Sequence, residues 1–301
     1  MKKLSLFLVA LTLMLVSCKP EIEKPTVETV SVTETETAFN VVGNVAADGG
    51  AEVTAKGVCW AKTQNPTIEN DKIDAGAGIG EFLCEITDLE PGTTYYVRAY
   101  ATNEAGTAYG EEKSFATKNM INGYEYVDLG LPSGLKWATH NVGAFDIYEI
   151  GSYFAWGELK PKNSFSMNNS LTYGLPIDDF SGNAEYDVAA SWGSTWRMPT
   201  EAEMMELKNN CKIEWVMINN VLQGSLLTGP NGNELFLPAG GIHVDSSVDF
   251  IESEAAYWTS TPDTFNGDLG FATFVYFYNN NFCNRGWMSR YVGMLVRPVS
   301  E

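Results

Sequence analysis

Hydrophobic and polar residues alternate with a period of two through much of the first third of the chain. Such alternation is typical of strands that bury one face, and the runs are short and separated by turn signals such as Asp48-Gly49-Gly50. Several short strands at this spacing predict an all-β antiparallel sandwich over residues 26 to 118. We expect the Tyr95 hydroxyl to return to the preceding turn as a tyrosine corner. The clearest run consists of Leu89, Pro91, Thr93, Tyr95, Val97 and Ala99, with the last three facing the core.

The pattern changes beyond residues 118 to 123, where longer loops and more tryptophan, asparagine and glycine follow. Thr200 and Glu203 form a capping box, and Met204, Leu207 and Cys211 then lie on one helical face. Short strand candidates surround this helix, so residues 124 to 300 predict an α+β domain. The strand candidates are Tyr124–Leu129, Lys136–Ala138, Leu226–Thr228, Glu234–Leu237, Ala272–Tyr278 and Gly293–Val299.

The first 18 residues have the pattern of an export signal. Lys2 and Lys3 precede 13 residues from Leu4 to Val16, which are too few for a membrane span of roughly 20. Small residues then lead to Cys18, which predicts a lipidated N-terminus after cleavage. An ordinary signal with an incidental cysteine is the alternative. Residues 19 to 25 predict a flexible tether. We expect an outer membrane lipoprotein of a Gram-negative bacterium, exposed at the cell surface and attached to the membrane by lipid alone.

The net charge restricts the classes of binding partner, and the spacing of the cysteines restricts the possible disulfide and zinc sites. Loss of Lys2 and Lys3 on processing takes the net charge from −19 to −21, which argues against nucleic acid or an anionic membrane surface as partner. The remaining cysteines lie at long, irregular spacings without a CxxC motif, so we expect buried free thiols and no zinc site. A disulfide between Cys59 and Cys84 remains open. The four cysteines are Cys59, Cys84, Cys211 and Cys283.

No sequence motif indicates a catalytic site, a metal site or a cofactor-binding site. His140 and His243 have no metal-ligand spacing, and the chain has no nucleophile elbow and no phosphate-binding loop. Calcium binding by Asp245, Asp249 or Glu252 remains open. A glycosidase needs paired carboxylates, but a solvated acidic surface explains the candidates, and we predict a non-enzyme. Those candidates are Glu158, Asp178, Asp179, Glu201, Asp245, Glu252 and Glu254.

Residues 26 to 118 resemble a fibronectin type III domain. Three segments carry the resemblance, which covers about 90 residues: Gly57–Trp60, Leu89–Ala99 and Lys113–Thr117. It implies only the fold, because such modules are usually spacers or adhesive units.

Residues 124 to 300 are similar to the Fibrobacter succinogenes major paralogous domain, which occurs in exported lipoproteins. The resemblance implies a C-type lectin-like fold, also related to formylglycine-generating enzymes. Cys211 and Cys283 do not reproduce the paired cysteines of that enzyme, so its activity is not carried over. We expect Trp137, Trp156, Trp196 and Trp258 in the core, and Arg197 and Arg297 on buried carbonyls or carboxylates. Seven ordered motifs carry the resemblance: Tyr126–Ala138, Asn141–Gly143, Tyr153–Glu158, Trp196–Thr200, Phe236–Gly241, Tyr257–Thr261 and Val296–Val299.

Residues 271 to 291 mix aromatic side chains with asparagine and serine, the chemistry of adaptable binding surfaces. C-type lectin-like proteins that this chain resembles bind ligands near their C-terminal strands, and in some of them such positions are hypervariable. A bland surface loop is the alternative. We expect Val275 and Phe277 to face inward, and Trp287 to anchor the ligand. The predicted ligand-binding residues are Tyr276, Tyr278, Asn279, Asn280, Asn281, Phe282, Asn284, Trp287, Ser289 and Tyr291.

These features predict a non-enzymatic adhesin or receptor that binds an extracellular protein or glycan through its C-terminal domain. Two alternatives remain: a carbohydrate-binding accessory of a polysaccharide-uptake system, and a structural envelope or fimbria-associated subunit. A sugar binder should present a flat aromatic row, and a protein binder a mixed patch. A structural subunit should present a donor strand or an open sheet edge.

Overall fold

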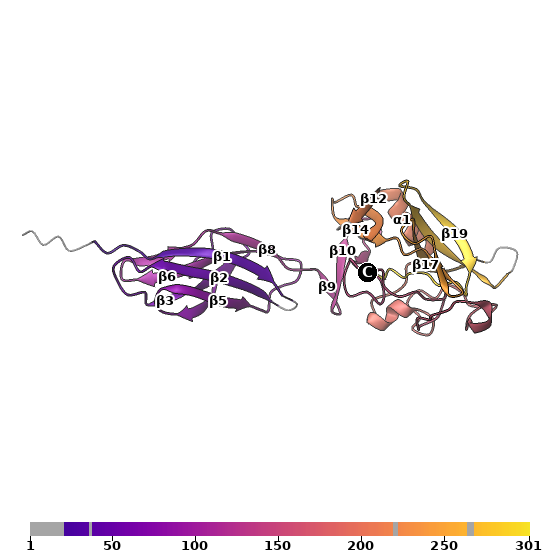
Figure 1. Ribbon diagram of the computed structural model, residues 1–301, viewed down its shortest axis with the longest axis horizontal. Helices are drawn as coiled ribbons and strands as arrows, with labels where there is room; N and C mark the ends of the chain where they lie inside the picture. Colours follow the sequence, from indigo (N-terminus) through magenta and orange to yellow (C-terminus); the bar gives the residue numbers. More distant parts are fainter. Residues whose placement is uncertain (1–20, 36–37, 219–221, 264–267) are drawn as a thin grey trace, which may run out of the picture. The chain divides into compact units, whose positions relative to one another are not determined.

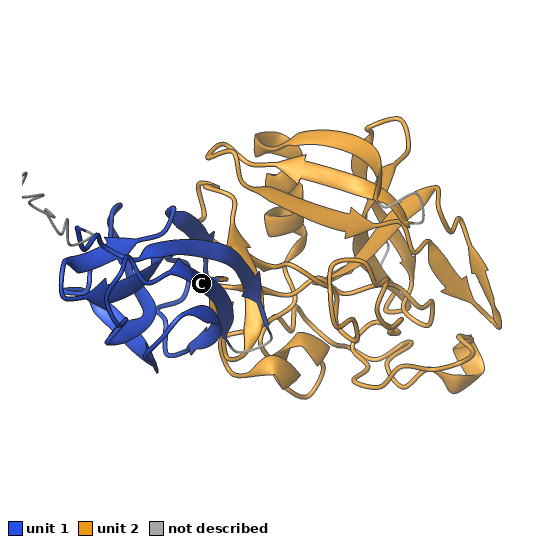
Figure 2. Ribbon diagram, turned by 60° about the vertical axis from the view of Figure 1, so that its left-hand side comes forward, with its two compact units in different colours: residues 1–117 blue, residues 118–301 orange. Residues whose placement is uncertain are grey.

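The computed structural model describes residues 21–35, 38–218, 222–263 and 268–301. It divides into two compact units, Met1–Thr117 and Lys118–Glu301 (Figure 2). The sequence placed the boundary in residues 118 to 123, next to this division. Cys18 lies outside the described residues. Among the helices that are described, none is long and apolar enough to cross a membrane.

Unit 1 is a β-sandwich of two antiparallel sheets (Figure 1). The alternating sequence predicted a sandwich, and the order of strands in these sheets is that of a fibronectin type III-like fold, which the resemblance implied. One sheet has the order β1-β2-β5, formed by Thr26–Glu34, Phe39–Ala47 and Gly80–Ile86. The other has the order β4-β3-β6-β7, with β8 also paired to β6; these strands are Asp71–Gly76, Ala55–Ala61, Thr94–Asn103, Gly106–Tyr109 and Lys113–Ala116.

The tyrosine corner of unit 1 forms as predicted. Tyr95, Val97 and Ala99 are buried on the inner face of β6, and the Tyr95 hydroxyl accepts a hydrogen bond of 3.1 Å from the Glu90 amide. That bond ties the strand to the turn that precedes it.

The predicted tether needs a correction at its C-terminal end. The Glu23 amide donates to the Gly49 carbonyl (2.9 Å), and the Glu23 carbonyl accepts from the side-chain Nδ2 of Asn103 (2.7 Å). Pro25 is buried. Residues 23 to 25 therefore belong to the sandwich, because long-range hydrogen bonds hold a segment whose sequence carries no strand pattern.

Unit 2 is mostly β-structure with one α-helix among its described residues. The helix, α1 (Glu201–Asn210), begins at the predicted capping box: the Glu203 amide donates to Thr200 Oγ1 (3.3 Å), and the Thr200 amide donates to Glu203 Oε2 (2.8 Å). Met204 and Leu207 are fully buried, whereas Cys211 ends the helix and is only half-buried.

Among the described residues of unit 2, the strands form four antiparallel sheets, and two 3-10 helices lie in the connections. The sheets have the orders β20-β11-β10-β9, β12-β13-β14, β15-β16 and β17-β18-β19. The 3-10 helices are η1 (Met167–Asn169) and η2 (Val188–Trp192). The strands are β9 (Met120–Ile121), β10 (Tyr124–Asp128), β11 (Lys136–Ala138), β12 (Lys212–Ile218), β13 (Leu222–Thr228), β14 (Glu234–Pro238), β15 (Ile242–Val244), β16 (Ser247–Asp249), β17 (Glu254–Asp263), β18 (Phe271–Tyr278), β19 (Cys283–Ser289) and β20 (Val299–Ser300).

The β17-β18-β19 sheet separates two hydrophobic clusters. Phe274 belongs to one cluster together with Trp156, Trp196 and Trp258, and Phe277 belongs to the other together with Trp137. All four tryptophans are fully buried, as predicted. Because both faces of β18 contact a core, this strand is a rigid support for whatever its ends present.

The four described cysteines are free thiols, and no Cys59–Cys84 disulfide forms. Burial raises the pKa of Cys283 to about 12 and the pKa of Cys59 to about 11. These thiols are therefore protonated near neutral pH and behave as small apolar side chains.

Candidate binding surface

The alternation predicted for β18 is present. Val275 and Phe277 are fully buried, while Tyr276 and Tyr278 are half-buried on the opposite face. Period-two geometry causes this division, since successive side chains of a strand point to opposite faces.

Three partly exposed rings form a surface at the turn between β18 and β19, which we call the aromatic row: Tyr276, Tyr278 and Phe282. Ring centroids lie 5.1 Å apart for Tyr276 and Tyr278, and 6.3 Å apart for Tyr276 and Phe282. The buried Phe274 ring lies 5.4 Å from Tyr276 and continues the row into the core. Phe282 is 45% exposed, so the row reaches solvent at its outer end.

Gly286 of β19 allows the Phe274 and Tyr276 rings to pack directly against the strand. A Cβ atom at this position would come within 2.6 Å of the Phe274 ring and 3.2 Å of the Tyr276 ring. Both rings therefore cover the glycine, which is why their positions are fixed by packing.

The predicted asparagines have two kinds of environment. The Asn281 side chain accepts a hydrogen bond of 2.7 Å from the Trp215 amide, and Asn280 accepts one of 3.1 Å from the Phe282 amide. Asn281 also has a positive φ of 63°, which asparagine tolerates. These two side chains shape the turn. Asn279 is exposed, and Asn284 accepts a hydrogen bond of 3.4 Å from Lys208.

The ten predicted residues do not form one surface. Trp287 pairs with Thr273 in the sheet register, so its side chain lies on the same face as Val275 and Phe277, opposite the aromatic row. Ser289 shares that face, since it pairs with Phe271. Tyr291 lies beyond the strand and contacts Tyr173 at 5.5 Å. Trp287 is nevertheless 57% exposed, with its ring held edge-on against Phe271 at 5.2 Å.

A buried carboxylate holds the Tyr278 ring of the aromatic row in place. Glu254 of β17 is only 4% exposed and is hydrogen-bonded to the Tyr278 hydroxyl. Burial raises the pKa of Glu254. The pKa of Tyr278 is also raised, mainly by burial and to a lesser extent by the negative charge of Glu254. The Tyr278 hydroxyl therefore stays protonated and donates to the carboxylate. Sequence patterns did not indicate this pair, because the two residues meet only across the sheet.

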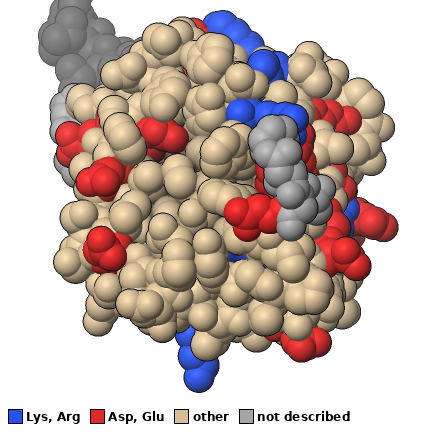
Figure 3. Space-filling view, turned by 90° about the vertical axis from the view of Figure 1, so that its right-hand side faces the viewer, with Lys and Arg blue, Asp and Glu red and all other residues tan. Residues whose placement is uncertain are grey.

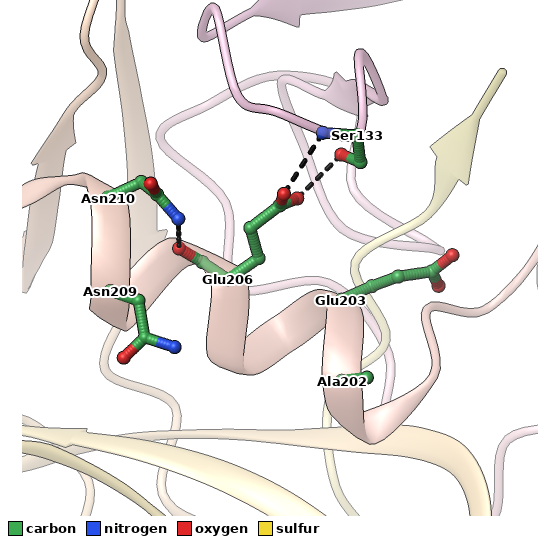
Figure 4. A pocket seen from close by; sticks show the side chains of 6 residues that line it. All are labelled: Ser133, Ala202, Glu203, Glu206, Asn209 and Asn210. Carbon is green, nitrogen blue, oxygen red and sulfur yellow. Dashed lines mark hydrogen bonds between the residues drawn. The ribbon is translucent and has the colours of Figure 1, made fainter.

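A separate open groove of about 330 Å³ lies along α1 (Figure 4). Its two carboxylates are already engaged: Glu206 accepts from the amide (3.0 Å) and hydroxyl (2.5 Å) of Ser133, and Glu203 accepts two bonds of 2.8 Å from Arg197. Hydrogen bonds from neighbouring segments therefore hold both carboxylates of the groove in place. The groove is lined by Ser133, Ala202, Glu203, Glu206, Asn209 and Asn210.

Other carboxylates proposed from the sequence also have structural partners. Glu158 pairs with Lys162, Glu201 pairs with Arg285, and Asp179 accepts from Ser260 and Thr261. Among the described residues, no group of three His, Cys, Asp or Glu side chains is arranged to hold a metal ion.

The two histidines predict a specific pH dependence of stability. Burial lowers the pKa of both His140 and His243, and His243 lies between the rings of Tyr153 (5.5 Å) and Phe165 (4.8 Å). The unfolded chain therefore takes up protons first as the pH falls below about 6.5, so stability is lost from that pH downward. We expect wild type to lose more unfolding free energy than His243→Gln between pH 7.5 and 5.5 in urea titrations. Equal losses would show that His243 does not titrate as its burial requires.

Comparisons with known proteins find likeness in part of the chain. No family model matches it, and no curated protein matches it. The sensor domain of the anti-sigma factor RsgI4 from Pseudobacteroides cellulosolvens is 17% identical, covering 33% of this chain and 100% of that one with a TM-score of 0.26. A fourth human fibronectin type III domain is 22% identical over 37% of this chain and 91% of its own, with a TM-score of 0.25. The sixth such domain of human fibronectin type III domain containing protein 3 is 24% identical over 35% and 92%, with a TM-score of 0.23.

Proposed function

We propose that this chain is a non-enzymatic surface lipoprotein whose second unit binds an extracellular protein ligand through the aromatic row and the adjoining turn. The observation that carries the proposal is a pair of half-buried tyrosine rings on a strand whose faces contact two hydrophobic clusters, with the exposed Phe282 ring in the adjoining turn. Rigid aromatic side chains give contact area with little loss of conformational entropy on binding. The exposed Asn279 beside them supplies adaptable hydrogen bonds.

The geometry of the row favours a protein over a sugar. The rings of Tyr276 and Tyr278 are inclined at 58° to each other, and those of Tyr276 and Phe282 at 38°. These angles make an uneven, mixed surface, whereas stacking against successive sugar rings needs a flat one. The irregular side chains of a protein surface can contact such inclined rings.

A glycan ligand is the second candidate, and Trp287 favours it. Its indole is 57% exposed and fixed against Phe271, which is suitable for stacking on one sugar ring. It lies on the opposite face of the sheet, so the two candidates have separate sites. A screen of residues 21–301, which contain both compact units, on protein and glycan arrays distinguishes them. We expect binding to proteins. Binding to glycans alone would favour a site at Trp287 instead of the aromatic row.

We propose that the remaining parts of the chain hold the aromatic row at a distance from the outer membrane. Unit 1 serves as a spacer, and unit 2 is a member of the Fibrobacter succinogenes major paralogous domain with a C-type lectin-like fold. Cys18 carries lipid that anchors the chain in the outer membrane of a Gram-negative bacterium.

The lipid anchor has a direct test. Cys18→Ala is expected to abolish labelling by a clickable palmitate and to release the protein from the membrane fraction, because one residue supplies the attachment. Labelling that persists in the variant would contradict the anchor.

A further inference from the structure

Strand β19 is an open edge of the sheet that holds the aromatic row. The opposite edge, β17, is covered: the Trp258 amide donates to Leu295 (3.0 Å) and the Ser260 amide to Pro199 (2.9 Å). On β19, the bonds Tyr278 N–H to Phe282 O and Arg290 N–H to Gly270 O mark the positions that bond to β18. Alternation along an antiparallel pair then directs the backbone groups of Cys283, Arg285 and Trp287 outward.

These outward groups have no hydrogen-bond partner within the part of the chain that the structure describes. A row of unpaired backbone amides and carbonyls at a sheet edge can form hydrogen bonds to an additional β-strand. The strand β19 runs toward the right-hand end of unit 2 in Figure 1, and the face seen from that end carries separate acidic patches among uncharged residues (Figure 3).

The edge lacks the devices that normally block strand addition. Its pairing with β18 has no register shift, it contains no proline, and Arg285 is its only charged residue. Two other described edges carry such devices: β4 has three charged side chains and a register shift, and β12 has the ion pair Lys212–Glu214 (2.7 Å). Natural sheets use such charges and irregularities against edge-to-edge pairing.

The side chains of β19 are self-complementary about Gly286. If two copies of the strand lie antiparallel and centred on this residue, Arg285 of one copy lies directly opposite Trp287 of the other, on the same face. The pair occurs twice, and each places a guanidinium beside an exposed indole, an attractive cation–π arrangement. Glu201 already orients Arg285 by contacts of 2.9 and 3.0 Å, and Phe271 orients Trp287 at 5.2 Å.

We propose that two copies of this chain associate by antiparallel pairing of β19 about Gly286, which joins their sheets into one of six strands. The twofold axis makes the interface isologous. Directly opposed residues share a face, so the two aromatic rows come to the same side of the joined sheet, and a multivalent ligand would contact both. The proposal is independent of the ligand surface, because that surface lies on the other face from Arg285 and Trp287.

Sedimentation of residues 21–301 over a range of concentrations tests the pairing. We expect a reversible monomer–dimer equilibrium that strengthens with added salt. Residues 21–301 lack Lys2, Lys3 and Lys19, so their net charge is 16 − 38 = −22, which repels like copies until salt screens it. Trp287→Lys should remain monomeric, because it removes the indole and places a cation opposite Arg285. The matched control Leu171→Lys, at a side chain 73% exposed in a different loop, should dimerise like wild type.

Amide hydrogen exchange of wild type fixes the register without any substitution. The amides of Arg285 and Trp287 should become protected as concentration rises, whereas the Gly286 amide, already bonded to β18, should not change. A wild type that stays monomeric at the highest concentration overturns the proposal. So does a dimer without added protection at Arg285 and Trp287, or equal dimerisation of Trp287→Lys.

Discussion

Replacing Arg297 with methionine is expected to lower the free energy of unfolding of unit 2 by about 3 kcal/mol or more. The Arg297 side chain is 1% exposed, and within the described residues its hydrogen bonds go to no carboxylate. Its guanidinium donates to Asn141 Oδ1 (2.8 Å), to the Ala138 carbonyl (2.9 Å) and to the Phe236 carbonyl (3.0 Å). One side chain thus satisfies three buried acceptors from separate segments.

Two effects oppose each other in this substitution. Burial disfavours the charged guanidinium and lowers the pKa of Arg297, so methionine removes an unfavourable term. However, methionine leaves all three acceptors without a donor, and each costs about 1–3 kcal/mol when buried and unpaired. Three such costs exceed the relief, because the carbonyl dipoles already compensate much of the buried charge.

Urea unfolding followed by tryptophan fluorescence measures the loss, since seven of the eight tryptophans lie beyond residue 118. Lys212→Met in the same unit is the matched control, because Lys212 is 68% exposed and pairs with the exposed Glu214 at 2.7 Å. It should cost less than about 1 kcal/mol. An unchanged free energy of unfolding for Arg297→Met would show that its bonds do not hold the segments together.

The second large effect is expected at the aromatic row. Phe282→Ala combined with Asn279→Ala should weaken ligand binding about 30-fold or more, since truncating a central interface aromatic often costs over about 2 kcal/mol. Both side chains are exposed, so the melting temperature should hardly change. Tyr278→Ala would be a poorer probe, because it leaves the buried Glu254 carboxylate without its hydroxyl partner.

Local patterns in the sequence predicted the features that depend on near neighbours. Alternation gave the sandwich of unit 1 and the inward face of β18, and the Thr200–Glu203 capping box fixed the start of α1. The Tyr95 hydroxyl bond was also predictable, since donor and acceptor are five residues apart. In each case the physical cause operates within one turn or one strand.

Features that depend on strand pairing could not be predicted. Trp287 and Tyr278 are close in sequence but lie on opposite faces, which follows only from the register of β18 and β19. The Glu254–Tyr278 contact and the open edge of β19 likewise need the strand order. Arg290, whose guanidinium lies 4.1 Å from the Trp156 ring, is buried although its neighbours in sequence are partly exposed. Long-range packing decides these positions.

The central claim is that the aromatic row binds a protein ligand. The most direct measurement compares residues 21–301 of the wild type, of Phe282→Ala with Asn279→Ala, and of Trp287→Ala on the same protein and glycan arrays, followed by titration of each hit. The account predicts a protein hit that the Phe282 and Asn279 substitutions weaken about 30-fold and that Trp287→Ala leaves within about threefold. Absence of any wild-type hit, or a hit lost with Trp287 and retained without Phe282 and Asn279, would contradict it.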